Sequence, residues 1–102
     1  MTDVQVNGVR LYYEEHGRGD PILVIHGTGS SAMVWSRTSV QALAEIGRVI
    51  VYDRRGCTRS ERPDPYVTNV PEHAEDAAAL IRALDATPAI VIGRSYGGET
   101  AL

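Results

Sequence analysis

The 102-residue sequence predicts an α/β fold, in which a mostly parallel sheet carries helices on both faces. Three observations support this class. Short apolar segments, typical of strands that are covered on both faces, occur at 22–26, 48–52 and 89–92. Segments with helical spacing of apolar residues separate these strands, and a hairpin signal precedes them. Because strands alternate with helices, the three apolar strands should run parallel.

The amino-terminal hairpin is expected from the dipeptide Asn7-Gly8. Asparagine and glycine accept the positive φ angles of a two-residue hairpin turn more readily than other residues do. The segments 4–6 and 9–15 are the two expected strands on either side of this turn. Residues 17–21, Gly-Arg-Gly-Asp-Pro, are then a loop that leads into the first apolar strand.

A first helix is expected near 31–46, between the strands 22–26 and 48–52. Gly47 is placed to end this helix. Residues 53–66, which are rich in charge, glycine and proline, are predicted to form a loop. Three apolar residues of the first helix share one helical face: Val40, Leu43 and Ala44.

A second helix is expected to run to about residue 85. Asn69 and Glu72 resemble a capping box at its start. Acidic side chains are favoured there by the helix dipole, and three of them fall in the first turns: Glu72, Glu75 and Asp76. The strand 89–92 follows, and a further helix is expected to begin after Gly97.

Composition excludes several classes of partner. The net charge is −3 and the ten basic residues are scattered, so neither nucleic acid nor an anionic membrane is an expected partner. No secretory signal or membrane-spanning run is visible in the sequence. Cys57 is the single cysteine, which excludes an internal disulfide and fits a reducing compartment. We therefore expect a cytoplasmic protein.

The pattern Gly93-x-Ser95-x-Gly97 follows the third apolar strand and precedes the last expected helix. In such a strand–turn–helix setting, glycines on both sides of the serine relieve crowding in a sharp turn that exposes the serine oxygen. The new helix also directs backbone N–H groups toward the serine, where negative charge develops during acyl transfer. The setting therefore predicts a catalytic serine.

Three motifs together resemble the α/β-hydrolase fold superfamily along nearly the whole chain. ILVIHGTG at 22–29 is similar to the third strand of that family and its His-Gly oxyanion loop. VIVYDRRG at 49–56 is similar to the fourth strand and its Asp-x-Arg-Gly turn, and IGRSYGG at 92–98 to the fifth strand and nucleophile elbow. The resemblance implies that residues 1–102 are the amino-terminal part of a single α/β-hydrolase domain.

The resemblance also implies roles for particular residues. Ser95 would be the nucleophile, and the backbone N–H groups of Thr28 and Tyr96 would form the oxyanion hole. Serine at this position, unlike the aspartate of haloalkane dehalogenases and epoxide hydrolases, implies a small-molecule ester or related acyl substrate and no cofactor. A cofactor-free haloperoxidase-like activity uses the same serine site and stays open.

The turn after the fourth strand departs from the family pattern Asp-x-Arg-Gly-x-Gly-x-Ser. Asp53, Arg55 and Gly56 match this pattern, whereas Thr58 occupies the position of the second glycine. Ser60 keeps its place at the end of the pattern. We expect the substitution to alter the backbone of the turn without changing a catalytic group.

A serine hydroxyl needs a base to take its proton and an acid to orient that base. In the family both partners follow the serine, so they are expected beyond residue 102 and these residues alone are expected to be inactive. Among the histidines present, His26 is expected to shape the oxyanion loop, and His16 and His73 are expected to be solvated. No metal-ligand spacing is present, and Cys57 is expected to be a bystander.

A dinucleotide-binding module is the alternative from another class. Residues 27–32 fit Gly-x-Gly-x-x-Ala between a strand and a helix, and Asp53 lies where an acid would bind a ribose hydroxyl. In the hydrolase interpretation, Asp53 instead makes structural hydrogen bonds or pairs with Arg54 or Arg55. A non-catalytic protein that keeps the hydrolase fold, alone or with a second polypeptide, is the remaining alternative.

Overall fold

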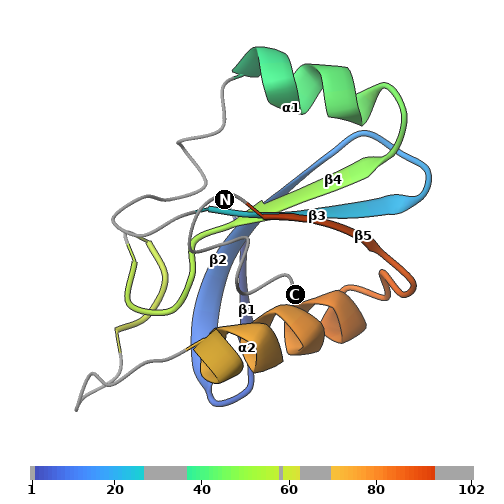
Figure 1. The fold of residues 1–102 in the computed structure, drawn as a ribbon. Coiled ribbons are helices and arrows are strands. Elements are labelled where there is room, and N and C mark those ends of the chain that lie inside the picture. The colour runs from blue at the N-terminus through green and yellow to red at the C-terminus, as the bar shows by residue number, and fades with distance from the viewer. Residues whose placement is uncertain (1, 27–36, 58, 63–69, 94–102) are drawn as a thin grey trace.

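The computed structural model describes residues 2–26, 37–57, 59–62 and 70–93. In this part of the chain, five strands form a single sheet in the order β1-β2-β4-β3-β5, and two helices accompany it (Figure 1). The elements in chain order are β1 (Thr2–Val6), β2 (Val9–His16), β3 (Pro21–Ile25), α1 (Arg37–Ala44), β4 (Arg48–Tyr52), α2 (Val70–Ala83) and β5 (Ile90–Gly93). Within these ranges, no helix is both long and apolar enough to cross a membrane.

The sheet is mixed, because the hairpin contributes the antiparallel pairs. β1 pairs antiparallel with β2, and β2 pairs antiparallel with β4. β3 lies between β4 and β5 and runs parallel to both. The predicted hairpin turn is confirmed, since Asn7 and Gly8 adopt positive φ angles of 48° and 76°. The α/β class and the three parallel strands are therefore as predicted.

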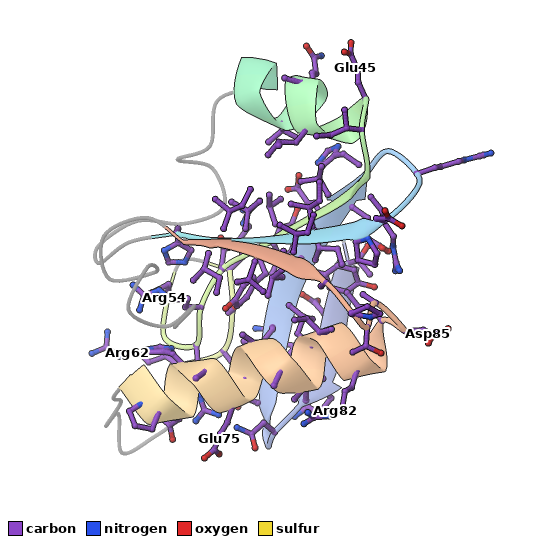
Figure 2. The ribbon with its side chains drawn as sticks, turned by 45° about the vertical axis from the view of Figure 1, so that its right-hand side comes forward. Glu45, Arg54, Arg62, Glu75, Arg82 and Asp85 are labelled. Carbon is purple, nitrogen blue, oxygen red and sulfur yellow. The ribbon has the colours of Figure 1, made fainter. Side chains whose placement is uncertain are left out.

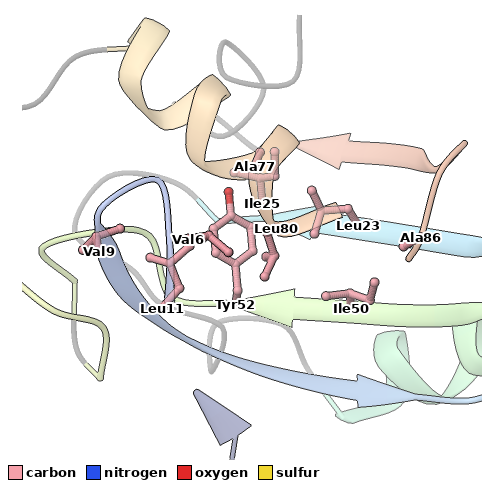
Figure 3. Packing of buried hydrophobic residues seen from close by; sticks show 10 residues of the cluster. All are labelled: Val6, Val9, Leu11, Leu23, Ile25, Ile50, Tyr52, Ala77, Leu80 and Ala86. Carbon is pink, nitrogen blue, oxygen red and sulfur yellow. The ribbon is translucent and has the colours of Figure 1, made fainter. Parts of the chain in front are cut away.

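The two helices cover opposite faces of the sheet, as expected (Figure 1). Successive side chains of a strand point to opposite faces, so a strand covered on both sides is apolar throughout. On one face, α1 packs through Val40, Leu43 and Ala44 against Ile22, Val24, Val49 and Val51. On the other face, α2 packs through residues that include Ala77 and Leu80 against Leu23, Ile25, Ile50 and Tyr52 (Figure 3).

Gly47 follows α1 as predicted, but for a different physical reason. It is not among the glycines with positive φ, so it does not act as a left-handed helix cap. A Cβ at this position would lie 2.6 Å from the Asp20 carbonyl oxygen and 2.8 Å from Ile22 Cδ1. The glycine therefore allows the chain to pass close to the start of β3, where the Arg48 N–H donates to that same Asp20 carbonyl.

Candidate active site

The carboxyl ends of β3, β4 and β5 lie at the same end of the sheet, because these strands are adjacent and parallel. The register places Ile25 of β3 opposite Gly93, the last residue of β5. The segments that contain Thr28 and Ser95 therefore leave the sheet from neighbouring positions. Thr28, Ser95 and Tyr96 themselves lie outside the described residues, so their roles stay predictions.

His26 comes directly after β3 and is fully buried. Its Nε2 lies 2.9 Å from the backbone nitrogen of Arg54, whose N–H donates to it. Only one nitrogen of a neutral imidazole can accept a hydrogen bond, so we assign the ring proton to Nδ1. Arg54 Nε also donates toward Nδ1, but at 3.5 Å this contact lies at the limit of hydrogen bonding, so the shorter contact to Nε2 decides the assignment. Because the Nε2 lone pair is engaged, the structural role expected for His26 is supported over a role as base.

Asp53 follows β4 and makes structural hydrogen bonds, as expected, and the arginine that binds its carboxylate is Arg59. Arg59 Nε lies 2.8 Å from Asp53 Oδ2, and the Arg59 backbone N–H donates to the same oxygen at 3.1 Å. The Arg59 guanidinium also lies 3.8 Å from the centre of the Tyr12 ring. Asp53 is fully buried, so its carboxylate is not exposed to bind a ribose as the dinucleotide alternative requires.

Ser60, which keeps the family position, connects the turn to the hairpin. Its hydroxyl accepts the Tyr12 N–H at 2.9 Å and donates to the Asp53 carbonyl. Thr58, the departure from the family pattern, lies outside the described residues. The connection that Ser60 makes explains why a small hydroxyl side chain suits this buried position.

Arg55 extends from the turn to α2 and makes an ion pair that was not predicted from the sequence. Its Nε and a terminal nitrogen lie 2.7 and 2.9 Å from the two oxygens of Asp76. The guanidinium also donates to the Asn7 carbonyl at 3.2 Å and lies 3.3 Å from Glu72. Asp76 in turn accepts from the Asn7 amide at 2.8 Å. The sequence shows Asp76 only as an acid near a helix start, and no local pattern indicates a partner 21 residues away.

His73 is buried, so the prediction of a solvated side chain is wrong. It lies in the amino-terminal half of α2, close to the turn after β4; Figure 2 shows Arg54 at this end of the molecule and Asp85 at the other. Burial is the main cause that lowers the pKa of His73 to about 4, and Arg54 contributes. This imidazole is therefore a weak base at neutral pH.

His16 and Cys57 behave as expected. His16 ends β2 opposite Val49, at the opposite end of the sheet from Gly93, and its exposed ring contacts Glu14 at 3.3 Å. Burial raises the pKa of the Cys57 thiol, which disfavours the nucleophilic thiolate. All three histidines of the sequence are among the described residues. His26 accepts the Arg54 N–H, His73 is buried, and His16 lies at the end of the sheet opposite Gly93.

Comparison with known proteins decides the family. A sequence model described as the alpha/beta hydrolase fold matches residues 20–102, which is most of the chain. The chain belongs to the α/β-hydrolase fold family.

The relatives of this α/β-hydrolase chain carry the names of different enzyme activities. It is 37% identical over 90 residues to the putative non-heme bromoperoxidase BpoC of Mycobacterium tuberculosis, covering 87% of this chain and 34% of the relative. It is 42% identical over 88 residues to the putative carbamate hydrolase RutD of Azorhizobium caulinodans, covering 86% and 32%. The solved epoxide hydrolase CorEH superposes with a TM-score of 0.89 at 34% identity, covering 98% and 35%. The chain therefore spans about a third of the length of these proteins.

Proposed function

We propose that this chain carries the nucleophile of a serine hydrolase that cleaves a carboxylic ester or related acyl bond through an acyl-enzyme. The observation that carries the proposal is the register of β3 and β5, in which Ile25 lies opposite Gly93. The His-Gly segment after Ile25 and the Gly-x-Ser-x-Gly segment from Gly93 therefore begin at adjacent positions. Ser95 and the backbone N–H groups of Thr28 and Tyr96 would then converge on one carbonyl group. The name of the putative carbamate hydrolase is consistent with chemistry at an acyl carbonyl.

In the proposed reaction, the Ser95 hydroxyl oxygen attacks the carbonyl carbon and its proton passes to a histidine base. The negative charge on the carbonyl oxygen is held by the N–H groups of Thr28 and Tyr96. When the tetrahedral intermediate collapses, the alcohol leaves with the proton from the histidine and the acyl group stays on Ser95. Water then releases the acid by the same steps.

We also propose that residues 1–102 alone do not turn over substrate. The reason lies in the three histidines. His26 uses Nε2 to accept the Arg54 N–H, His73 is buried, and His16 lies at the far end of the sheet. The base for Ser95 must therefore come from another part of the active protein.

A haloperoxidase-like activity is a second candidate, because the chain is 37% identical to a putative bromoperoxidase. It would use the same Ser95. Bromide-dependent halogenation by the protein from its native source, in the presence of peroxide and an organic acid, would favour this candidate over simple ester hydrolysis.

The test labels the protein isolated from its native source with a fluorophosphonate and maps the adduct by mass spectrometry. We expect the adduct on Ser95, and we expect Ser95→Ala to lower p-nitrophenyl ester turnover by about a thousandfold or more. An adduct elsewhere would contradict the assignment, as would unchanged turnover in the variant. Residues 1–102 alone should show no turnover that depends on Ser95, and turnover lost in Ser95→Ala would overturn the second part of the proposal.

A further inference from the structure

We propose that Asp76 on α2 and Arg55 act as positioning residues, which hold the backbone amide of Arg54 against His26 and so fix the carboxyl end of β3. Neither side chain is expected to touch substrate. Their effect passes through the turn that follows β4, which we call the β4 turn (the described residues 53–57, 59 and 60). The importance of this arrangement for catalysis rests on the proposed function, but the arrangement itself can be tested without activity.

The first step is the attachment of the β4 turn to α2. Arg55 is 8% exposed and Asp76 is 1% exposed, so their ion pair is shielded from water. Two contacts join the guanidinium to both carboxylate oxygens, at 2.7 and 2.9 Å, and such bidentate pairs fix direction as well as distance. Asn7 contacts both partners, through its carbonyl and its side-chain amide. Arg55 is thereby held by the helix and the hairpin together.

The second step is the attachment of the other end of the β4 turn. Arg59 binds the Asp53 carboxylate through its guanidinium and its backbone N–H. Ser60 connects Tyr12 of β2 to the Asp53 carbonyl. The two residues that flank Arg54 in the chain are therefore both held by ionic contacts, Asp53 on one side and Arg55 on the other.

The third step is the Arg54 amide itself, which lies between these two fixed residues. Its N–H donates to His26 Nε2 at 2.9 Å. His26 is the last described residue before the segment that contains Thr28. A rotation of the peptide before Arg54 would remove this donor from His26 Nε2. The contacts of Arg55 and Asp53 oppose that rotation from both sides.

The geometry points to positioning because a buried ion pair is weak support for net stability. The cost of removing two charges from water is comparable to their attraction, and apolar substitutes are often as stable. The guanidinium of Arg55 binds both oxygens of Asp76, and this constrains the orientation of Arg55 far more than an apolar contact would. The pair therefore has its clearest effect on the conformation of the β4 turn.

The experiment measures hydrogen exchange of the Arg54 amide in residues 1–102, relative to the Val51 amide in β4. We expect Arg55→Lys and Asp76→Asn to speed Arg54 exchange about tenfold more than Val51 exchange, because only the turn opens locally. Glu72→Gln weakens the longer 3.3 Å contact with Arg55 and should give a smaller effect in the same direction. Asp3→Asn is the matched control, because it breaks an exposed Arg–Asp pair on the hairpin.

A second measurement reads the tautomer of His26 by nitrogen NMR. In the unaltered chain, Nε2 should give the signal of an unprotonated nitrogen. In Arg55→Lys and Asp76→Asn it should move toward that of a protonated nitrogen, as the amide donor is lost. Ser95→Ala should leave both measurements unchanged, so a failure of the proposed function would not affect them.

Parallel changes in Arg54 and Val51 exchange would show a global loss of stability and would overturn the proposal. Unchanged Arg54 exchange together with an unchanged His26 tautomer would also overturn it. If Asp76→Asn does not fold, Arg55→Lys and Glu72→Gln give the same comparison, since the first keeps the positive charge and the second alters a partly exposed contact.

Discussion

Charged residues that follow β4 take partners both from their own turn and from a helix further along the chain. Asp53 binds Arg59, and Arg55 binds Asp76. The structural hydrogen bonds predicted for Asp53 are present, but Arg59 was not named among its expected partners. Three arginines lie within six positions of Asp53, and their spacing does not show which one folds back onto it. The elements that bring such partners together must be known first.

The buried His73 predicts how the stability of the fold depends on pH. Burial, followed by Arg54, lowers its pKa to about 4 from an ordinary 6.5, whereas Asp76 and Glu72 act in the opposite direction. Because the folded pKa lies below the unfolded one, the neutral ring stabilises the fold above about pH 6.5, and this contribution is lost as the pH falls toward about 4. We expect the free energy of unfolding to drop by about 2 kcal/mol from about pH 7.5 to about pH 5 on account of His73.

Urea unfolding at several pH values measures this drop. His73→Gln should lose the part of the pH dependence that belongs to the imidazole. His16→Gln should keep it, because His16 is exposed and contacts only a surface glutamate among the described residues. Equal pH dependence in the unaltered chain and in His73→Gln would show that the ring titrates normally in the folded state.

The strands and helices can be predicted from the sequence more fully than the individual contacts can. Apolar runs at 22–26 and 48–52 predict strands that are covered on both faces, and α1 and α2 provide that cover. The run at 89–92 predicts the same, but Ile90 and Val91 of β5 are exposed among the described residues. The hairpin turn follows from Asn7 and Gly8 alone, because the φ preferences that form it are local. Gly47 shows the limit: its position after the helix is visible in the sequence, but its contact with β3 is not.

The close approach of Gly47 to the start of β3 predicts that Gly47→Ala lowers the free energy of unfolding. The added Cβ would meet the Asp20 carbonyl oxygen at 2.6 Å, and a backbone atom yields less easily than the end of a side chain. The chain between α1 and β4 must then move away from the start of β3. We expect the free energy of unfolding to fall by about 2 kcal/mol in urea unfolding followed by circular dichroism.

Gly8→Ala provides the comparison. The hairpin glycine has positive φ, but no atom of the described residues lies within 4 Å of the position that an added Cβ would take. Its substitution therefore costs only backbone strain, which is about 1 kcal/mol. A loss in Gly47→Ala no larger than the loss in Gly8→Ala would contradict the close approach described above.

The sheet as a whole has two edges of different character. β1 contains Asp3, which pairs with Arg10 at 3.1 Å, and its exposed positions are polar. β5 pairs with β3, and among the described residues no strand lies on its other side. Residues 86–93 carry no charge, and Ile90 is 59% exposed. An apolar edge without charges is a site for pairing with another strand, so the two edges should differ in association.

Ile90→Lys tests this asymmetry in residues 1–102. A charge on the β5 edge opposes strand pairing between molecules, so we expect the fraction in sedimenting assemblies to fall by roughly a factor of five. The free energy of unfolding should change by only about 0.5 kcal/mol, because the side chain is mostly exposed. Gln5→Lys places the same charge on β1, whose edge is already polar, and should leave association unchanged. Equal effects of the two lysines would mean that net charge, rather than the β5 edge, controls association.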